Sequence, residues 1–170
     1  MPRRIMVILA AALLALSLAF PEGGKAPVED SAAFARYCNP VFRFCVKYPE
    51  SLLPHQQVLP DSSGIGLQPY DRSALVTVRG DRQAAGKTPR TYFAEQLDAL
   101  TPLQGQLSLL DTLYGDDYYE AYFTWQTESI FHQAFFFDEY CVIMIARVPT
   151  NRPILLKQIR EEVKLEFENR

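Results

Sequence analysis

Positive charge is scarce in this sequence. Its 170 residues include 17 Lys and Arg against 20 Asp and Glu, which gives a formal net charge of −3. A generic nucleic-acid-binding protein needs a basic surface, so the composition argues against one. There is only one long apolar run, at the N-terminus, which argues against a polytopic membrane protein. Aromatic residues make up 12 % of the chain, which argues against intrinsic disorder, and the length suits one domain.

The motifs of several common active sites are missing as well. The sequence has no G-x-S-x-G motif of a serine hydrolase, and Gly64-x-Gly66 lacks the third glycine of a dinucleotide-binding turn. It has no C-x-x-C pair for zinc and no acidic loop with the spacing of a calcium site. The two histidines, His55 and His132, are far apart in the chain, and a histidine bonded within the sheet is the simpler interpretation of His132. We therefore predict no catalytic residue, no metal site and no cofactor.

The N-terminus carries the clearest targeting signal. Arg3 and Arg4 precede an unbroken apolar stretch, and Ser17 and Ala19 supply the small residues that signal peptidase requires. The apolar run is shorter than the roughly 20 residues of a membrane-spanning helix. We predict a signal peptide over residues 1–19, cleaved after Ala19, and export to the periplasm or the extracellular space with no stable membrane span. An uncleaved anchor that tethers the chain to the membrane is the alternative.

The three cysteines are Cys38, Cys45 and Cys141. In an oxidising compartment two of them should pair. The spacing between Cys38 and Cys45 suits a small loop closed at the start of a strand, so a Cys38–Cys45 disulfide is the preferred pairing. Cys45–Cys141 and Cys38–Cys141 remain open, because strand neighbours can be distant in sequence. The remaining cysteine is expected to be a buried thiol.

The chain is divided into a leader, a tether and a single domain. Residues 20–37 mix Pro, Gly and charged residues and are expected to form the tether, with a short helix at 29–37 as an alternative. The domain is predicted to span residues 38–170.

The first half of the domain opens with an alternation of apolar and polar residues, and this period-2 pattern predicts a strand at 41–48. Pro49 ends this strand because proline cannot donate to a ladder. After a turn signal at 61–64, two further strands are predicted at 65–70 and 73–79. Thr88 as the N-cap and Pro89 at the first helical position begin a helix predicted over 89–100.

The second half is predicted to be a meander of four strands, at 107–114, 118–126, 130–137 and 140–148. Their short connections favour antiparallel neighbours, because parallel pairing needs a long crossover. A last helix is predicted over 152–166, with Leu155, Ile159 and Val163 on its apolar face. The fold class is therefore α+β, an antiparallel sheet with helices packed on its faces.

Three short motifs add to this outline. They are Phe42-x-Phe44-x-x-x-Tyr48-Pro49, Gly64-Ile65-Gly66-Leu67 followed by Ala74-Leu75-Val76, and Gly115-Asp116-Asp117-Tyr118-Tyr119. With the order of elements, these motifs resemble the PsbP-like (also DcrB-like) α/β/α sandwich family over residues 38–168. The resemblance implies a sandwich fold and a mostly non-enzymatic family whose members bind quite different partners. It implies no active-site residue, since fold does not fix function.

The densest aromatic segment lies in the second strand of the predicted meander. Alternation places Tyr118 and Tyr122 on the face opposite Tyr119, Phe123 and Trp125. One set should belong to the core, and the other is available for recognition, because tyrosine and tryptophan are favoured at interfaces. The acidic turn before this strand is expected to be solvated. The predicted partner-binding residues are Tyr118, Tyr122, Asp116 and Asp117.

The predicted function is that of an exported, non-catalytic accessory protein that engages a protein complex or another envelope component. The alternative is a small-ligand or metal-ion binding protein of the cell envelope, with its site in a cleft between sheet and helix. The third hypothesis is that the protein is an enzyme of unrecognised type. A closed pocket containing His132 would favour the ligand-binding alternative, whereas exposed aromatics without converging polar groups would favour protein binding.

Overall fold

The computed structural model describes residues 33–100 and 107–168, and the account below concerns these residues. The predicted signal peptide at 1–19 and the larger part of the predicted tether lie outside them. Within the two described ranges, no helix is both long and apolar enough to cross a membrane.

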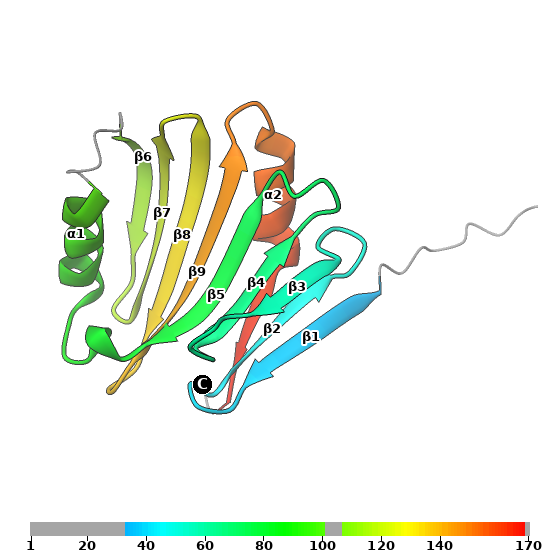
Figure 1. Cartoon of the computed structure of the whole chain (residues 1–170). Helices are drawn as coiled ribbons and strands as arrows, with labels where there is room; N and C mark the ends of the chain where they lie inside the picture. The colour runs from blue at the N-terminus through cyan, green and yellow to red at the C-terminus, as the bar shows by residue number, and fades with distance from the viewer. Residues whose placement is uncertain (1–32, 101–106, 169–170) are drawn as a thin grey trace, which may run out of the picture. The chain divides into compact units, whose positions relative to one another are not determined.

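A seven-stranded antiparallel sheet forms the centre of the fold (Figure 1). Its spatial order is β3-β4-β5-β9-β8-β7-β6. Strands β6 to β9 follow one another across the sheet in reverse chain order, so the predicted antiparallel meander is confirmed. The strands span His55–Val58 (β3), Gly64–Gln68 (β4), Leu75–Asp81 (β5), Leu107–Tyr114 (β6), Tyr118–Trp125 (β7), Glu128–Phe136 (β8) and Cys141–Pro149 (β9).

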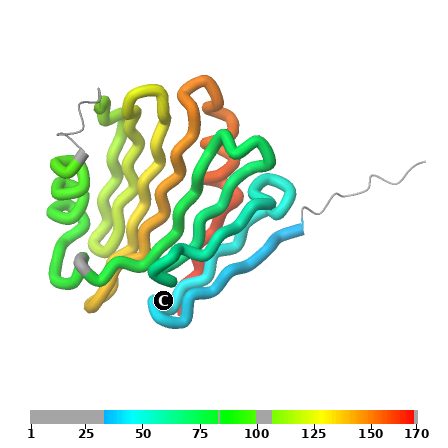
Figure 2. Tube along the Cα trace, viewed as in Figure 1, coloured from blue at the N-terminus to red at the C-terminus, as the bar shows by residue number. Residues whose placement is uncertain are grey.

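A second sheet of three strands has the order β1-β2-β10. Its strands are Phe34–Asn39 (β1), Phe44–Pro49 (β2) and Lys164–Phe167 (β10). The helices are a 3-10 turn at Arg82–Ala84 (η1), Pro89–Leu100 (α1) and Pro153–Glu162 (α2). Figure 2 shows how the C-terminal segment returns to the first strands, because β10 lies beside β2.

One face of the large sheet packs against α2 and the small sheet. This first core takes alternate residues from β9 and β2 and one residue from α2, and each of them is at most 2 % exposed. Alternation along the strands directs these side chains to a single face. They are Val142, Met144, Ala146, Val148, Phe44, Val46, Tyr48 and Ile159.

The other face of the large sheet packs against α1. The ring of Phe93 on this helix lies 4.9 Å from that of Tyr119 and 6.4 Å from that of Phe123. The β9 residues between those of the first core, such as Ile143, face this second core. Helices therefore cover both faces of an antiparallel sheet, and the predicted α+β class is confirmed.

Helix α1 has the predicted bounds. The Thr88 hydroxyl oxygen accepts a hydrogen bond from the Thr91 backbone N–H at 3.3 Å, which satisfies one of the free donors of the first turn. Pro89 occupies the first helical position, where its missing N–H carries no cost.

Two predictions at the ends of the domain are wrong. Residues 34–37, assigned to a tether or a short helix, belong to β1. The last helix ends at Glu162 instead of continuing to 166, because Val163 is extended and the next four residues form β10. Both strands alternate between exposed and half-buried residues and pair with the two sides of β2. This pairing outweighs the local helical pattern.

The remaining differences concern strand bounds. Strand β3 forms at an edge of the large sheet where a loop was expected. Strand β2 begins at Phe44 instead of residue 41, because residues 40–43 form a turn in which Arg43 has a φ of 48°. The other strands differ from their predicted bounds by at most two residues at either end.

Candidate functional site

The four predicted partner-binding residues come from the β6–β7 hairpin. Asp116 and Asp117 lie in its turn and are exposed. Tyr118 and Tyr122 lie on β7 and are half-buried. Both tyrosines face the side of the sheet that carries α2 and the small sheet, and the buried Tyr119 faces α1. The structure therefore brings the four residues to one region, but neither tyrosine is fully exposed.

Tyr118 is held between neighbours on both sides. Its ring stacks on that of Phe135 of β8, with the ring centroids 5.9 Å apart. On the other side it covers Gly115, where an added Cβ would lie 2.1 Å from a ring carbon of Tyr118. Glycine at this position lets the ring lie directly against the turn.

Tyr122 is also part of the protein's own packing. Its ring lies 4.9 Å from the ring of Phe131, and the guanidinium of Arg160 on α2 lies 5.1 Å from its centroid, a cation–π arrangement. The Tyr122 hydroxyl is buried without a hydrogen-bond partner among the described residues. Burial raises the pKa of Tyr122 to about 12. This side chain contributes more to the first core than the sequence indicated.

Three exposed leucines of β6, the strand next to β7, were missed by the sequence analysis, and one of them, Leu109, pairs with Phe123 and so faces the α1 side. They are Leu109, Leu110 and Leu113 of β6, with exposed fractions of 48 %, 63 % and 54 %. Strand β6 is the edge of the large sheet, and its register with β7 shifts between Leu109 and Asp111. An apolar strand is usually taken as a buried one, so only the position at the edge reveals that these side chains are exposed.

A polar groove of about 450 Å³ adjoins this surface. It runs between α2 and β10 on one side and β7 and β8 on the other, and it includes Glu120, Gln133 and Lys164. Leu113 pairs with Glu120 across the strands, so the groove begins where the apolar edge ends. An apolar patch with a polar border is the usual composition of a protein–protein interface.

Two further hollows lie on the opposite face of the sheet. The larger, of about 680 Å³, covers β3, β4 and β5 and is lined by polar side chains such as Gln57, Gln68 and Thr77 together with apolar ones such as Val58 and Leu75. The smaller, of about 200 Å³, lies between α1 and the sheet and includes His132 and Trp125. A pocket containing His132 is therefore present, but it is partly open, whereas the ligand-binding alternative predicts a closed one.

His132 is a buried and neutral histidine. It is 4 % exposed, and the Tyr119 hydroxyl lies 3.4 Å from its Nε2 and 3.5 Å from its Nδ1. Burial, and secondarily the charge of Arg79, lowers its pKa to about 3. His132 therefore carries no charge at neutral pH.

The described residues offer little for catalysis or for a metal ion. Over 33–100 and 107–168, no three His, Cys, Asp or Glu side chains are placed to hold a metal. Cys141 is buried, and burial raises the pKa of its thiol to about 12. A thiol needs to be a thiolate to act as a nucleophile, so this cysteine is unsuited to the role.

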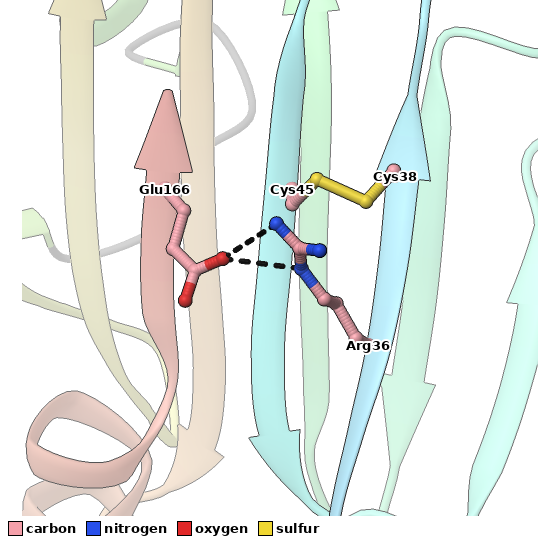
Figure 3. Close-up of a disulfide and its surroundings, with 4 residues drawn as sticks. All are labelled: Arg36, Cys38, Cys45 and Glu166. Atoms are coloured by element: carbon pink, nitrogen blue, oxygen red, sulfur yellow. Dashed lines mark hydrogen bonds and ion pairs between the residues drawn. A yellow bond between two sulfur atoms is a disulfide. The ribbon is translucent and has the colours of Figure 1, made fainter. Parts of the chain in front are cut away.

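Cys38 and Cys45 form a disulfide between β1 and β2 (Figure 3). The two residues are directly opposite each other in the strand register. Beside them, Arg36 Nη2 lies 2.9 Å from Glu166 Oε2, so side chains of β1 and β10 meet across β2 (Figure 3). Cys38 is exposed, which places the disulfide at the surface of the small sheet.

No protein-family model matches this sequence, and no curated protein matches it. Among solved structures, the chain is similar to the solution structure of cyanobacterial PsbP (CyanoP) from Synechocystis sp. PCC 6803. The TM-score is 0.61 at 11 % sequence identity, over 81 % of this chain and 94 % of that chain. The fold is PsbP-like. The predicted resemblance is thus confirmed for the architecture, and at this identity the likeness transfers no function.

Proposed function

We propose that this chain is an exported, non-catalytic accessory protein that binds a protein partner of the cell envelope through its β6–β7 hairpin. The binding surface consists of two of the exposed leucines of β6, the acidic turn and the accessible edges of two tyrosines. We call it the hairpin surface, and it comprises Leu110, Leu113, Asp116, Asp117, Tyr118 and Tyr122.

The exposure of Leu110 and Leu113 carries this proposal. Both side chains are more than half exposed on the edge strand of the large sheet. Proteins usually protect such edges with charges or short strands, because apolar edges promote association. Leu113 lies at the end of β6 next to the turn that contains the exposed Asp116 and Asp117, and the exposed Asp111 lies between Leu110 and Leu113, so the exposed leucines are bordered by acidic residues. A partner with an apolar patch bordered by basic residues would complement this surface.

The irregular register of β6 indicates how the partner is held. The shift between Leu109 and Asp111 interrupts the regular ladder that an added strand would need. The partner is therefore expected to contact side chains of the hairpin surface rather than to extend the sheet by a strand.

The surface disulfide supports an extracytoplasmic location. Disulfides persist in oxidising compartments and are rare in the cytosol. The predicted signal peptide at 1–19 leads to the same location. Export and cleavage are tested together by purifying the full chain from its host and measuring the mass of the mature protein. A mature N-terminus after Ala19 is expected, and an intact leader would favour the anchored alternative.

A site-specific photocrosslinker tests the binding surface in the native host. The crosslinker replaces Leu113 in one variant and Ile154 of α2 in a matched control, because Ile154 is 74 % exposed but lies outside the hairpin surface. We expect one dominant adduct with an envelope protein from position 113 and none of the same mass from position 154. Equal adducts at both positions, or none at 113, would contradict the proposal.

A further inference from the structure

The cavity between α1 and the large sheet lies on the face opposite the hairpin surface. Its volume is about 200 Å³. The walls are contributed by α1, β7, β8 and β9 and are mainly aromatic or aliphatic. Representative lining residues are Phe93, Leu97, Phe123, Trp125, Ile130 and Ile145.

The size of the cavity limits what it can hold. Sites for drug-sized molecules occupy roughly 300–1,000 Å³. An apolar cavity of about 150 Å³ holds benzene. The cavity beneath α1 therefore suits a molecule of one ring with a small substituent.

Four lining residues carry polar groups, namely Gln96, Arg147, Trp125 and His132, and the last two lack good hydrogen-bond partners. Trp125 lines the cavity, and no acceptor among residues 33–100 and 107–168 reaches its buried Nε1–H. His132 also lines it, and the Tyr119 hydroxyl is almost equidistant from its two ring nitrogens. A neutral imidazole has one donor and one acceptor, and a hydroxyl in this position satisfies only one of them well. Unpaired buried groups of this kind cost free energy unless a ligand or water pairs with them.

The charges around the cavity favour a neutral occupant. Arg147 is the ionised side chain among its lining residues, and it is already paired with Glu128, with Nε 2.9 Å from Oε2. The histidine contributes no positive charge, because it is buried and neutral. A carboxylate ligand would have to lose its hydration without gaining an unpaired cation, which is unfavourable.

We propose that this cavity is a binding site for a small neutral molecule of one aromatic ring that carries a hydrogen-bond acceptor. The ring packs against the aromatic walls, and the acceptor takes the hydrogen bond of Trp125 Nε1–H or of His132. This site is separate from the hairpin surface, so it stands whether or not the proposed protein partner exists.

The single tryptophan of the chain makes the test direct. In a nitrogen-15-labelled sample of the mature protein, the indole N–H of Trp125 gives one cross-peak that reports on the cavity. The probes are acetophenone, ethylbenzene, which has the same carbon skeleton without the carbonyl oxygen, and benzoate, which adds a charge. We expect a saturable shift with acetophenone, roughly fivefold weaker binding of ethylbenzene, and no saturable shift with benzoate.

The pattern across the three probes decides the outcome. No saturable shift with acetophenone would overturn the proposal. Benzoate binding as tightly as acetophenone would overturn the preference for a neutral ligand, and equal affinities of acetophenone and ethylbenzene would overturn the role of the polar groups.

Two variants that fill the cavity test whether the ligand that shifts the Trp125 cross-peak binds inside the cavity. Ile145→Phe adds volume inside the walls, and Ala99→Phe adds it at the exposed rim, where a larger side chain is tolerated by the fold. Both should abolish saturable binding, while Ile154→Ser on the exposed face of α2 should leave it unchanged. If Ile145→Phe does not fold, Ala99→Phe alone decides, and undiminished binding in that variant would contradict the assigned site.

Removal of the indole donor tests the hydrogen bond separately. In Trp125→Phe, measured by calorimetry because the reporter is lost, acetophenone should lose its roughly fivefold advantage over ethylbenzene. An unchanged advantage would assign the hydrogen bond to His132. The higher affinity for acetophenone over ethylbenzene should then disappear in His132→Phe. Persistence of the advantage in both variants would overturn the proposed recognition.

Discussion

The two faces of the large sheet differ in how completely they are covered, although the same strands supply both. The first core lies beneath α2 and the small sheet and consists of well-buried aliphatic and aromatic side chains. The second lies beneath α1 and contains Phe93, Tyr119, a buried histidine and a cavity of about 200 Å³. Over β3, β4 and β5 the same face is hollowed and lined by both polar and apolar side chains.

This difference separates close packing from the capacity to hold a small molecule. A close-packed apolar core contributes most of the free energy of folding, and any loss of volume there leaves a void. A face that retains unpaired polar groups and empty volume contributes less but can accept a ligand. We therefore expect substitutions on the two faces to have unequal effects, even at adjacent positions of one strand.

Strand β9 offers the strongest test, because Met144 faces the first core and Ile145 lines the cavity on the other face. Met144→Ala should lower the free energy of unfolding by about 3 kcal/mol, since Met144 is only 2 % exposed. Ile145→Ala should lower it by about 1.5 kcal/mol, because that side chain is half-buried and already borders empty space. Denaturant unfolding of both variants measures the two values. Equal decreases in the free energy of unfolding would contradict the proposed difference between the two faces.

The second test is the dependence of stability on pH, which His132 should dominate between pH 6.5 and 4. The folded protein keeps His132 neutral because burial lowers its pKa to about 3, whereas the unfolded chain takes up the proton near pH 6.5. The unfolded state therefore binds more protons as the pH falls, and stability decreases. The loss from His132 should be roughly 2.5 kcal/mol on going from pH 7 to 4.5.

A variant that lacks His132 isolates this contribution. In His132→Phe the stability curve should be flatter between pH 7 and 4.5 than in the wild type. Asp71 also titrates differently in the two states, because hydrogen bonds from Ser73 lower its pKa to about 2, but its contribution is lost only below about pH 4. A wild-type curve as flat as that of the variant would show that His132 is accessible to protons in the folded state.

The sequence predicted those parts of the fold that depend on local signals. The meander follows from short connections and period-2 alternation, and α1 follows from Thr88 and Pro89. Strands β1 and β10 could not be predicted in this way, because each is stabilised by pairing with β2. For β10 this partner is more than a hundred residues away in the chain.

The candidate site was predictable to a similar extent. Alternation correctly separated Tyr118 and Tyr122 from Tyr119, but their burial depends on the elements that cover them. Arg160 of α2 lies over Tyr122, and β10 lies beyond Phe135. The exposure of Leu110 depends on β6 being an edge strand, a property of the sheet order and not of the local sequence.

The smallest expected effect concerns single hydroxyl groups on the two faces. The Tyr122 hydroxyl faces the first core without a partner among the described residues, whereas the Tyr92 hydroxyl on the α1 side donates to Asp81 Oδ2 at 2.6 Å. Tyr122→Phe should leave the free energy of unfolding unchanged or raise it by up to about 1 kcal/mol, because it removes an unpaired buried group. Tyr92→Phe should lower it by about 1.5 kcal/mol, because a hydrogen bond to a carboxylate is lost. Denaturant unfolding of the two variants measures both changes in the free energy of unfolding. Destabilisation by Tyr122→Phe would mean that the Tyr122 hydroxyl has a hydrogen-bond partner in solution. Because Tyr122→Phe keeps the ring, crosslinking from position 113 should persist in this variant. The unfolding experiment then reports on the role of the Tyr122 hydroxyl in stability, and the crosslink reports on partner binding.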